Sequence, residues 1–234
     1  MNSDNVAEVE ELPTAMSDEA NGALQEALEV LSTLQATIKK QVLGRDDVIE
    51  LAIIALIADG HILLEDFPGS GKTTLAKALG EAIVNGFSND ESIVPFRRIQ
   101  FTPDLLPSDV TGVPVFDSNS NAFYFRHGPL FAHIVLADEI NRTSPKVQSA
   151  MLEAMEELQV TVDGVTHNLE HPFIVMATQN PIEYEGTFPL PEAQLDRFLM
   201  RLSLGYPTFN EEMSVIEIQE TTHPVSYTHL RAHE

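Results

Sequence analysis

Two glycines, a lysine and two threonines stand close together in LLEDFPGSGKTTLAKALG, residues 63–80. Glycine lets the backbone turn sharply and approach an anion, so that successive N–H groups can surround phosphate oxygens. Lys72 suits the β- and γ-phosphates of a nucleotide, Thr73 suits a Mg²⁺ ion, and a helix starting near Gly71 would point its positive end at the anion. The stretch therefore predicts a site for the phosphates of a nucleotide, made by Pro68, Gly69, Ser70, Gly71, Lys72, Thr73 and Thr74.

One position departs from the strict phosphate-loop pattern G-x-x-x-x-G-K-[ST], because Asp66 stands where the first glycine is expected. This position shapes the bend after the preceding strand and need not contact phosphate. The substitution weakens the match to the pattern more than it weakens the chemistry. Taken alone, an imperfect match to the pattern could also arise by chance.

A pair of acids follows an apolar run that ends at Ala137. Open α/β sheets bind their ligands at the carboxyl ends of the strands, which is where this pair would lie. We expect Asp138 to hold Mg²⁺ through water and Glu139 to polarise the water that attacks the γ-phosphate. The alternative is a simple helix cap, since the next segment has a helical pattern.

Asn180 ends a third apolar run in the sequence ATQNP. Its amide could orient the attacking water by accepting one hydrogen bond and donating another. A turn residue before Pro181 is the alternative. The spacing of Asn180 after the acidic strand favours the catalytic interpretation.

Arg197 precedes the last predicted strand in LPEAQLDRF, residues 190–198. A guanidinium can stabilise charge on a transferring phosphoryl group, which contributes about 10³ to 10⁵ in rate where such groups have been measured. Arg142 is the rival for this role. It could instead pair with neighbouring acids, and the sequence does not separate the two.

The elements that would position these residues alternate between helices and strands, which is typical of an α/β fold with a parallel sheet covered on both faces. One helix is expected from Leu24 to Val42, and a second, capped by Asp46 or Asp47, is expected to reach Ala58 and to be buried all round. The strands are expected at residues 61–65, near 98–102, 133–137, 173–177 and 199–204. Two hairpins are expected in addition, at 113–126 and at 160–167, the latter around Asp163-Gly164.

The composition narrows the class of protein. Thirteen Lys and Arg residues stand against 36 Asp and Glu residues, so the formal net charge of −23 disfavours nucleic-acid or anionic-membrane binding. The basic pairs Lys39-Lys40 and Arg97-Arg98 are expected on solvated faces. The chain has no cysteine, its first 20 residues contain no Lys or Arg, and its longest apolar run is too short for a membrane span. These features predict a soluble cytoplasmic protein.

Four segments can be distinguished along the chain. Residues 1–21 are acidic and without periodicity, so they predict a disordered lead. The core is expected over 22–206, and a short remainder over 207–224 follows it. The final residues, 225–234, continue no pattern and are interpreted as a non-native tail.

Taken in order, the motifs LLEDFPGSGKTT, IVLADEINR, ATQNP and PEAQLDRF resemble the MoxR family of AAA+ ATPases over about residues 35–206. The resemblance implies an AAA+ P-loop NTPase core with a five-stranded parallel sheet and two inserted hairpins. It also implies that Val42, Leu43 and Gly44 lie beside the adenine, and that Arg197 acts in trans across the subunit boundary of a ring, commonly a homo-hexamer.

What members of that family do extends the expectation. They act as chaperone-like remodellers that mature or activate protein complexes, often with a partner that has a von Willebrand A (VWA) domain. The family's helical lid is a full small domain, whereas only residues 207–224 remain for it here. Weak nucleotide binding, poor assembly and slow hydrolysis are expected for a chain with so short a lid.

Two other functions remain open at this stage. One is a nucleotide-dependent binding module that has lost hydrolysis, which the presence of Glu139 disfavours. The other is a DNA-directed AAA+ relative, which would need basic hairpin tips. The tips here, DSNSN and VDGVT, contain neither Lys nor Arg.

Overall fold

The computed structural model describes residues 18–65, 69–83, 93–179 and 187–205. Within these ranges the chain alternates helices and strands, as expected for an α/β protein. The helices are α1 (Asp18–Lys39), α2 (Asp46–Ile57), α3 (Lys72–Ile83), α4 (Pro107–Thr111), the 3₁₀ turn η1 (Ile140–Arg142), α5 (Pro145–Glu157) and α6 (Glu192–Leu195).

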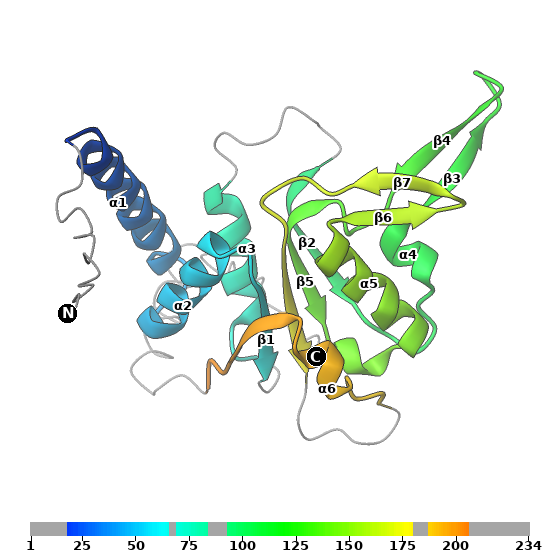
Figure 1. Ribbon diagram of the computed structural model, residues 1–234. Coiled ribbons are helices and arrows are strands. Elements are labelled where there is room, and N and C mark those ends of the chain that lie inside the picture. Colours follow the sequence, from blue (N-terminus) through cyan, green and yellow to red (C-terminus); the bar gives the residue numbers. More distant parts are fainter. Residues whose placement is uncertain (1–17, 66–68, 84–92, 180–186, 206–234) are drawn as a thin grey trace, which may run out of the picture.

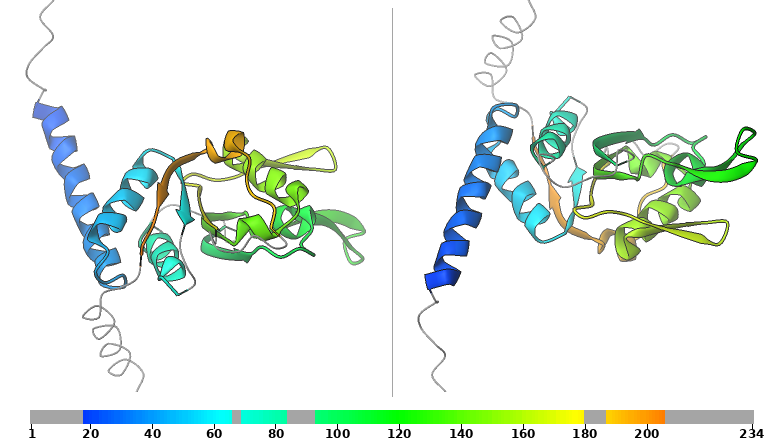
Figure 2. Two further views of the ribbon diagram at one scale, coloured as in Figure 1. Left: turned by 90° about the horizontal axis from the view of Figure 1, so that it is seen from below. Right: turned by 90° about the horizontal axis from the view of Figure 1, so that it is seen from above.

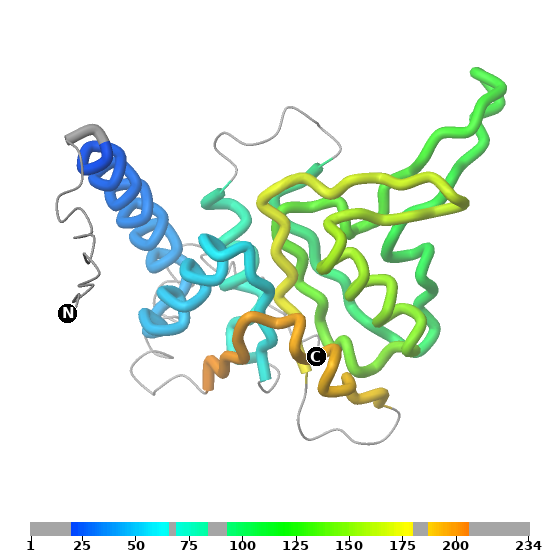
Figure 3. Tube along the Cα trace, in the orientation of Figure 1, coloured from blue at the N-terminus to red at the C-terminus, as the bar shows by residue number. Residues whose placement is uncertain are grey.

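Five strands form one parallel sheet in the order β2-β5-β8-β1-β9, which confirms the predicted fold class (Figure 1). They are β1 (His61–Glu65), β2 (Val94–Gln100), β5 (Ala132–Asp138), β8 (Ile174–Gln179) and β9 (Phe198–Leu202). Strands β5, β8 and β1 lie in the middle and are almost wholly buried. Figure 3 shows β9 running beside β1 although almost the whole core separates them in sequence.

Alternate residues of the central strands feed two separate hydrophobic cores, because successive side chains of a strand point to opposite faces. Val135 belongs to the core that α5 covers, with Val147 and Met151. Leu136 belongs to the core that α2 and α3 cover, with Ile49 and Leu75. Figure 2 shows these helices on opposite sides of the sheet. Because helices cover both faces of the sheet, the carboxyl ends of its strands are the place that remains for a site.

Two antiparallel hairpins project from the core in a common direction (Figure 1). They are formed by β3 (Gly112–Asp117) with β4 (Ala122–His127) and by β6 (Gln159–Val162) with β7 (Val165–Asn168). Asp163 and Gly164 both have positive φ angles, 50° and 79°, as the tight turn of the second hairpin requires. The hairpins contact each other through Phe125 and His167, whose rings stack at 3.7 Å.

Three expectations about the first two helices are wrong. Helix α1 begins at Asp18, so the predicted disordered lead extends four residues too far into it, and the helix ends at Lys39 rather than at Val42. Glu19 and Ala20 are good helix formers, so the helix can begin before its apolar periodicity does. The N-cap of α2 is Arg45, so Asp46 and Asp47 lie in its first turn instead of capping it.

Helix α2 is also less buried than predicted. Its apolar sequence suggested burial on all sides, but the helix covers one face of the sheet and buries only the residues that point toward it. Leu51, Ile54 and Ile57 are exposed on the opposite side. Within the described ranges, no helix is both long enough and apolar enough to cross a membrane.

Candidate functional site

A cavity of about 430 Å³ lies at the carboxyl edge of the sheet, where β5 and β8 end and α3 begins. The segment after β1, the start of α3 and the ends of β2, β5 and β8 all contribute to it. Its lining consists of Gly69, Ser70, Gly71, Lys72, Thr73, Thr74, Arg98, Gln100, Asp138, Glu139, Thr178 and Gln179. The structure thus brings the predicted glycine-rich loop and the predicted acidic pair to one cavity.

The glycines of the loop have the backbone conformation that favours glycine. Gly69 and Gly71 have φ angles of 85° and 93°, which other residues adopt only with strain. A methyl group built on either one would meet no atom within 4 Å. Both positions therefore face open space rather than packed neighbours, and a bound anion could approach their backbone closely.

Helix α3 begins at Lys72, so its first turn forms one wall of the cavity. The N–H groups at a helix start have no carbonyl partner within the helix, and they lie at the positive end of its dipole. The first helical hydrogen bond of this segment runs from the Leu75 N–H to the Gly71 carbonyl, at 3.0 Å. Loop, helix start and lysine together give this wall a positive potential that suits phosphate.

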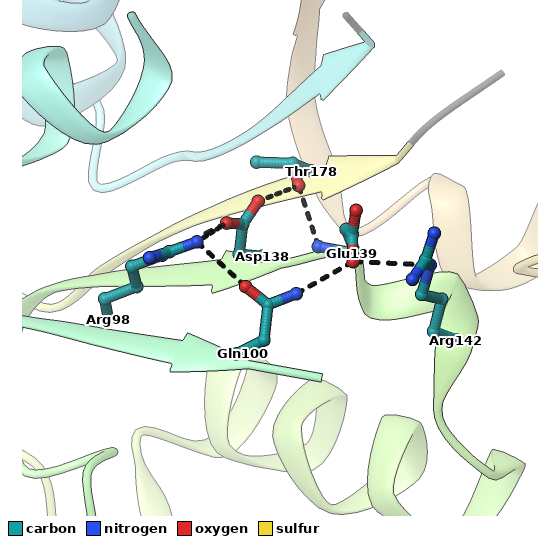
Figure 4. A network of polar contacts seen from close by, with 6 residues as sticks. All are labelled: Arg98, Gln100, Asp138, Glu139, Arg142 and Thr178. Carbon is teal, nitrogen blue, oxygen red and sulfur yellow. Dashed lines mark hydrogen bonds and ion pairs between the residues drawn. The ribbon is translucent and has the colours of Figure 1, made fainter. Parts of the chain in front are cut away.

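Asp138 lies at the opposite side of the cavity and is fixed by two neighbours (Figure 4). Thr178 donates a hydrogen bond to its Oδ1 at 2.7 Å. Arg98 donates to its Oδ2 from Nη2 at 2.5 Å and from Nε at 3.1 Å. Both partners come from adjacent strands, β8 and β2, so the sheet itself sets the position of this carboxylate.

Glu139 has a strained backbone, with φ 58° and ψ 49° in the left-handed region. Its backbone N–H donates to Thr178 Oγ1 at 2.8 Å. Its Oε2 accepts a hydrogen bond from Gln100 Nε2 at 2.8 Å and lies 3.3 Å from Arg142 Nε. Such a conformation costs about 1–3 kcal/mol and persists only where the surrounding structure holds it in place.

The residues present fit a nucleotide with a magnesium ion. Buried polar atoms that lack a hydrogen-bond partner among the described residues include Ser70 Oγ and Gln179 Nε2, both in residues that line the cavity. Thr73 and Asp138 offer hydroxyl and carboxylate oxygens, the hard donors that Mg²⁺ prefers. The described part of the chain contains no group of three or more His, Cys, Asp or Glu residues that could cage a metal.

The two candidate arginines lie in different places. Arg142 reaches the cavity through its contact with Glu139. Arg197 lies just before β9, whose first residue pairs with His61 at the amino end of β1, so it is at the opposite edge of the sheet. There it forms an ion pair with Glu156 and donates to the Leu152 carbonyl at 2.9 Å. Arg197 therefore does not reach the cavity of its own chain.

Other predicted residues are placed outside the cavity or outside the described structure. Val42, Leu43 and Gly44 connect α1 to α2 and are absent from the described lining of the cavity, and Val42 packs in the core under α2 and α3. Arg45, the next residue, donates to the carbonyl of Gly205 at 3.1 Å. Pro68 and Asn180, together with Asp66, lie outside the described residues.

Sequence reasoning missed four lining residues, Arg98, Gln100, Thr178 and Gln179. Arg98 is exposed, as predicted, but the prediction missed that its guanidinium pairs with Asp138 and lines the cavity. Arg98 and Gln100 are two residues apart on β2 and so share a face, and Gln100 lies opposite Asp138 in the register. The sequence predicted this strand near residues 98–102, whereas β2 begins at Val94, so the alternation of its side chains was not recognised.

Comparisons with known proteins agree with this geometry. Residues 61–200 match the ATPase family associated with various cellular activities (AAA). The chain is 58% identical over 188 residues to the protein YeaC of Bacillus subtilis (strain 168), covering 80% of this chain and 56% of that protein. It is 43% identical over 187 residues to Chaperone MoxR1 of Mycobacterium tuberculosis (strain ATCC 25618 / H37Rv), covering 80% and 47%.

A solved structure is similar as well. The crystal structure of a protein from Cytophaga hutchinsonii ATCC 33406, described as a candidate ATPase, has a TM-score of 0.72 and 40% sequence identity, covering 86% of this chain and 59% of that one. The chain thus spans about half the length of the relatives that it matches. With the family match over residues 61–200 and the similarity to MoxR1, these findings show that the chain belongs to the MoxR family of AAA+ ATPases.

Proposed function

We propose that the chain binds ATP with Mg²⁺ at the cavity and hydrolyses it. The observation that carries the proposal is the meeting of Gly69 to Thr74 with Asp138 and Glu139 around one cavity, where buried donors lack partners among the described residues. Phosphate needs donors and positive potential, and hydrolysis needs a base opposite them. The two walls of the cavity offer these two features.

Each residue has a distinct role in this proposal. The backbone of Gly69, Ser70 and Gly71 surrounds the phosphates, and Lys72 neutralises the β- and γ-phosphates. Thr73 and Asp138 would hold the Mg²⁺ ion, which when bound neutralises charge that develops on the phosphates. Thr74 completes the first turn of the helix that faces them.

Glu139 would act as the general base for the attacking water. Its carboxylate is engaged by Gln100 and Arg142 in the described structure, so it must exchange at least one of these contacts for the water. Asn180, which directly follows the lining residue Gln179, would orient the same water. Val42, Leu43 and Gly44 would lie beside the adenine, next to the start of α2.

Arg197 would act on the nucleotide of a neighbouring copy. Its position at the edge of the sheet opposite the cavity supports this, since it cannot reach the phosphates of its own chain. A ring of subunits, most simply a homo-hexamer, would place Arg197 against the next cavity and would couple hydrolysis to relative motion of subunits. A complete helical lid would be needed for stable assembly.

At the level of the cell, we propose that the protein remodels other protein complexes, with a VWA-domain partner. The support is the similarity to a protein named a chaperone, and the acidic chain, which favours protein clients over nucleic acid. Both the clients and the partner are proposals for the full-length protein.

The experiment that tests hydrolysis compares phosphate release by the lid-complete protein with that of Glu139→Gln. The proposal expects steady release that the variant lowers by about two orders of magnitude or more, while ATP still binds. Equal background rates in both proteins would contradict hydrolysis and favour a binding module that nucleotide occupancy switches. DNA binding at low ionic strength would instead favour a DNA-directed relative.

A further inference from the structure

Arg98 forms an ion pair with Asp138, the carboxylate that we propose as a ligand of the metal ion. Two of its N–H groups, on Nη2 and Nε, donate to the same oxygen of Asp138, Oδ2, at 2.5 and 3.1 Å (Figure 4). A carboxylate oxygen offers about two lone pairs, so Arg98 uses the full acceptor capacity of Oδ2. We propose that Arg98 is a built-in counter-ion, which holds Asp138 in the metal-free state and leaves it when Mg²⁺ binds. The inference deepens the proposed function and rests on it.

The burial of the two partners decides which one moves. The Asp138 side chain is 14% exposed and also accepts a hydrogen bond from Thr178, whereas the Arg98 side chain is 47% exposed. Arginine has a long side chain with many rotamers, and water is available on its open side. The carboxylate can therefore stay in place while the guanidinium swings away.

The charge balance of the cavity explains why a counter-ion is needed there. Among the described lining residues, Lys72 and Arg98 carry positive charge and Asp138 and Glu139 carry negative charge. Without Arg98, the carboxylates of Asp138 and Glu139 would lie next to each other on one wall, with Lys72 on the opposite wall and Arg142 paired with Glu139 alone. Like charges at close range repel each other. Arg98 removes this repulsion until a divalent cation can replace it.

Arg98 also links the metal position to the proposed base. Its Nη2 donates to Gln100 Oε1 at 2.8 Å, and Gln100 Nε2 donates in turn to Glu139 Oε2 at 2.8 Å. A movement of Arg98 away from Asp138 therefore removes the hydrogen bond that orients Gln100. Metal binding at Asp138 would in this way loosen the hold on Glu139, so that the base is released when the metal has arrived.

The test measures metal affinity rather than turnover. Mn²⁺, observed by electron paramagnetic resonance, is titrated into the full chain saturated with the non-hydrolysable analogue AMP-PNP. Arg98→Gln removes the competing cation and keeps a polar side chain. We expect the metal midpoint of Arg98→Gln, which is the Mn²⁺ concentration at half-saturation, to be about three- to tenfold lower than that of the wild type. The effect is of this size because a half-exposed ion pair contributes only a modest free energy. Unchanged or weaker metal binding in the folded variant overturns the inference.

Arg97→Gln is the matched control, because it makes the same charge change on the neighbouring residue of β2, whose side chain points to the other face of the sheet. Its metal midpoint should equal that of the wild type, and a shift as large as that of Arg98→Gln would show a general charge effect and overturn the inference. If Arg98→Gln does not fold, Arg98→Lys replaces it. One ammonium cannot reproduce the two contacts from Nε and Nη2, so a smaller shift in the same direction is expected and no shift contradicts the inference.

A second readout separates this inference from the proposed function. If AMP-PNP does not bind the wild type, the proposed function fails, and the nucleotide-free chain then decides about Arg98. In that state Mg²⁺ should raise the melting temperature of Arg98→Gln more than that of the wild type, because only the variant leaves Oδ2 of Asp138 open. An equal effect of Mg²⁺ on both proteins overturns the inference.

Discussion

Thr178 donates a hydrogen bond to Asp138 at 2.7 Å, and the same hydroxyl accepts one from the backbone N–H of Glu139 at 2.8 Å. One buried side chain on β8 thus fixes the carboxylate proposed for the metal and the left-handed backbone of the proposed base. Replacing it should affect both at once.

We expect Thr178→Val to lower phosphate release and to destabilise the chain by about 1–3 kcal/mol, because the Glu139 N–H would lose its partner in a poorly hydrated place. Urea unfolding and a phosphate assay measure the two effects. Thr178→Ser keeps the hydroxyl and serves as control, so equal losses in both variants would show that the methyl group, not the hydrogen bonds, matters.

Gly71 permits a test of the loop that separates backbone strain from ligand binding. Gly71→Ala places a methyl group at a φ of 93° and into open space, and Gly164→Ala does the same at 79° at a hairpin tip, also without a neighbour within 4 Å. Each should destabilise by about 1–2 kcal/mol. Only Gly71→Ala should weaken nucleotide binding, by about tenfold or more. Calorimetric titration decides, and equal affinities in both variants would contradict the assignment of the loop.

If Arg197 acts on the nucleotide of a neighbouring subunit, its replacement should impair hydrolysis in that neighbour rather than in its own subunit. Arg197→Ala in the lid-complete protein should lower phosphate release by at least about tenfold without lowering nucleotide affinity. Mixing it with Lys72→Ala should restore part of the activity, because each subunit supplies what the other lacks. Glu156→Gln removes the same ion pair but keeps Arg197, so the arginine has only a structural role if this control loses as much activity.

The buried side chain of His61 should make the free energy of unfolding depend on pH. It is buried at the start of β1, where its Nε2 lies 3.1 Å from the Met155 carbonyl and its Nδ1 accepts from the Val175 N–H at 3.1 Å. Burial lowers the pKa of His61 below 6.5, although the Met155 carbonyl opposes the shift. The unfolded chain therefore binds a proton at a higher pH than the folded chain does.

The free energy of unfolding should consequently fall as the pH drops from 6.5 toward the lowered pKa, by at most about 1.4 kcal/mol per pH unit for this one group. Urea unfolding at several pH values above 5 measures it. The carboxylates of Asp104 and Asp117, whose pKa values are lowered by hydrogen bonds from Thr102 and Asn119, act only below about pH 4. His61→Leu should flatten the slope between pH 5 and 6.5, and a slope that persists would assign it to other groups.

The sheet was the most predictable part of the fold from sequence. Strands β5 and β8 are buried on both faces, so they appear as continuous apolar runs, and the acids that follow β5 had to lie at the carboxyl edge. Asp163-Gly164 identified its hairpin because only a few residue pairs suit two positive φ angles.

Other features depend on tertiary contacts that local patterns do not contain. Apolar sequence does not reveal that α2 has only one covered side, so its exposed face was missed. The pairing of Arg98 with Asp138 depends on the register of β2 against β5, and the left-handed backbone of Glu139 depends on Thr178, 39 residues later. Such contacts become visible only when the strand order is known.

The central claim is that the loop and helix start bind the phosphates of ATP. Titration of ATP and Mg²⁺ into the wild type and into Lys72→Ala, followed by calorimetry, tests it most directly. The account predicts that the wild type binds and that the variant, folded as judged by its melting curve, does not. Equal affinity of the two proteins would contradict it.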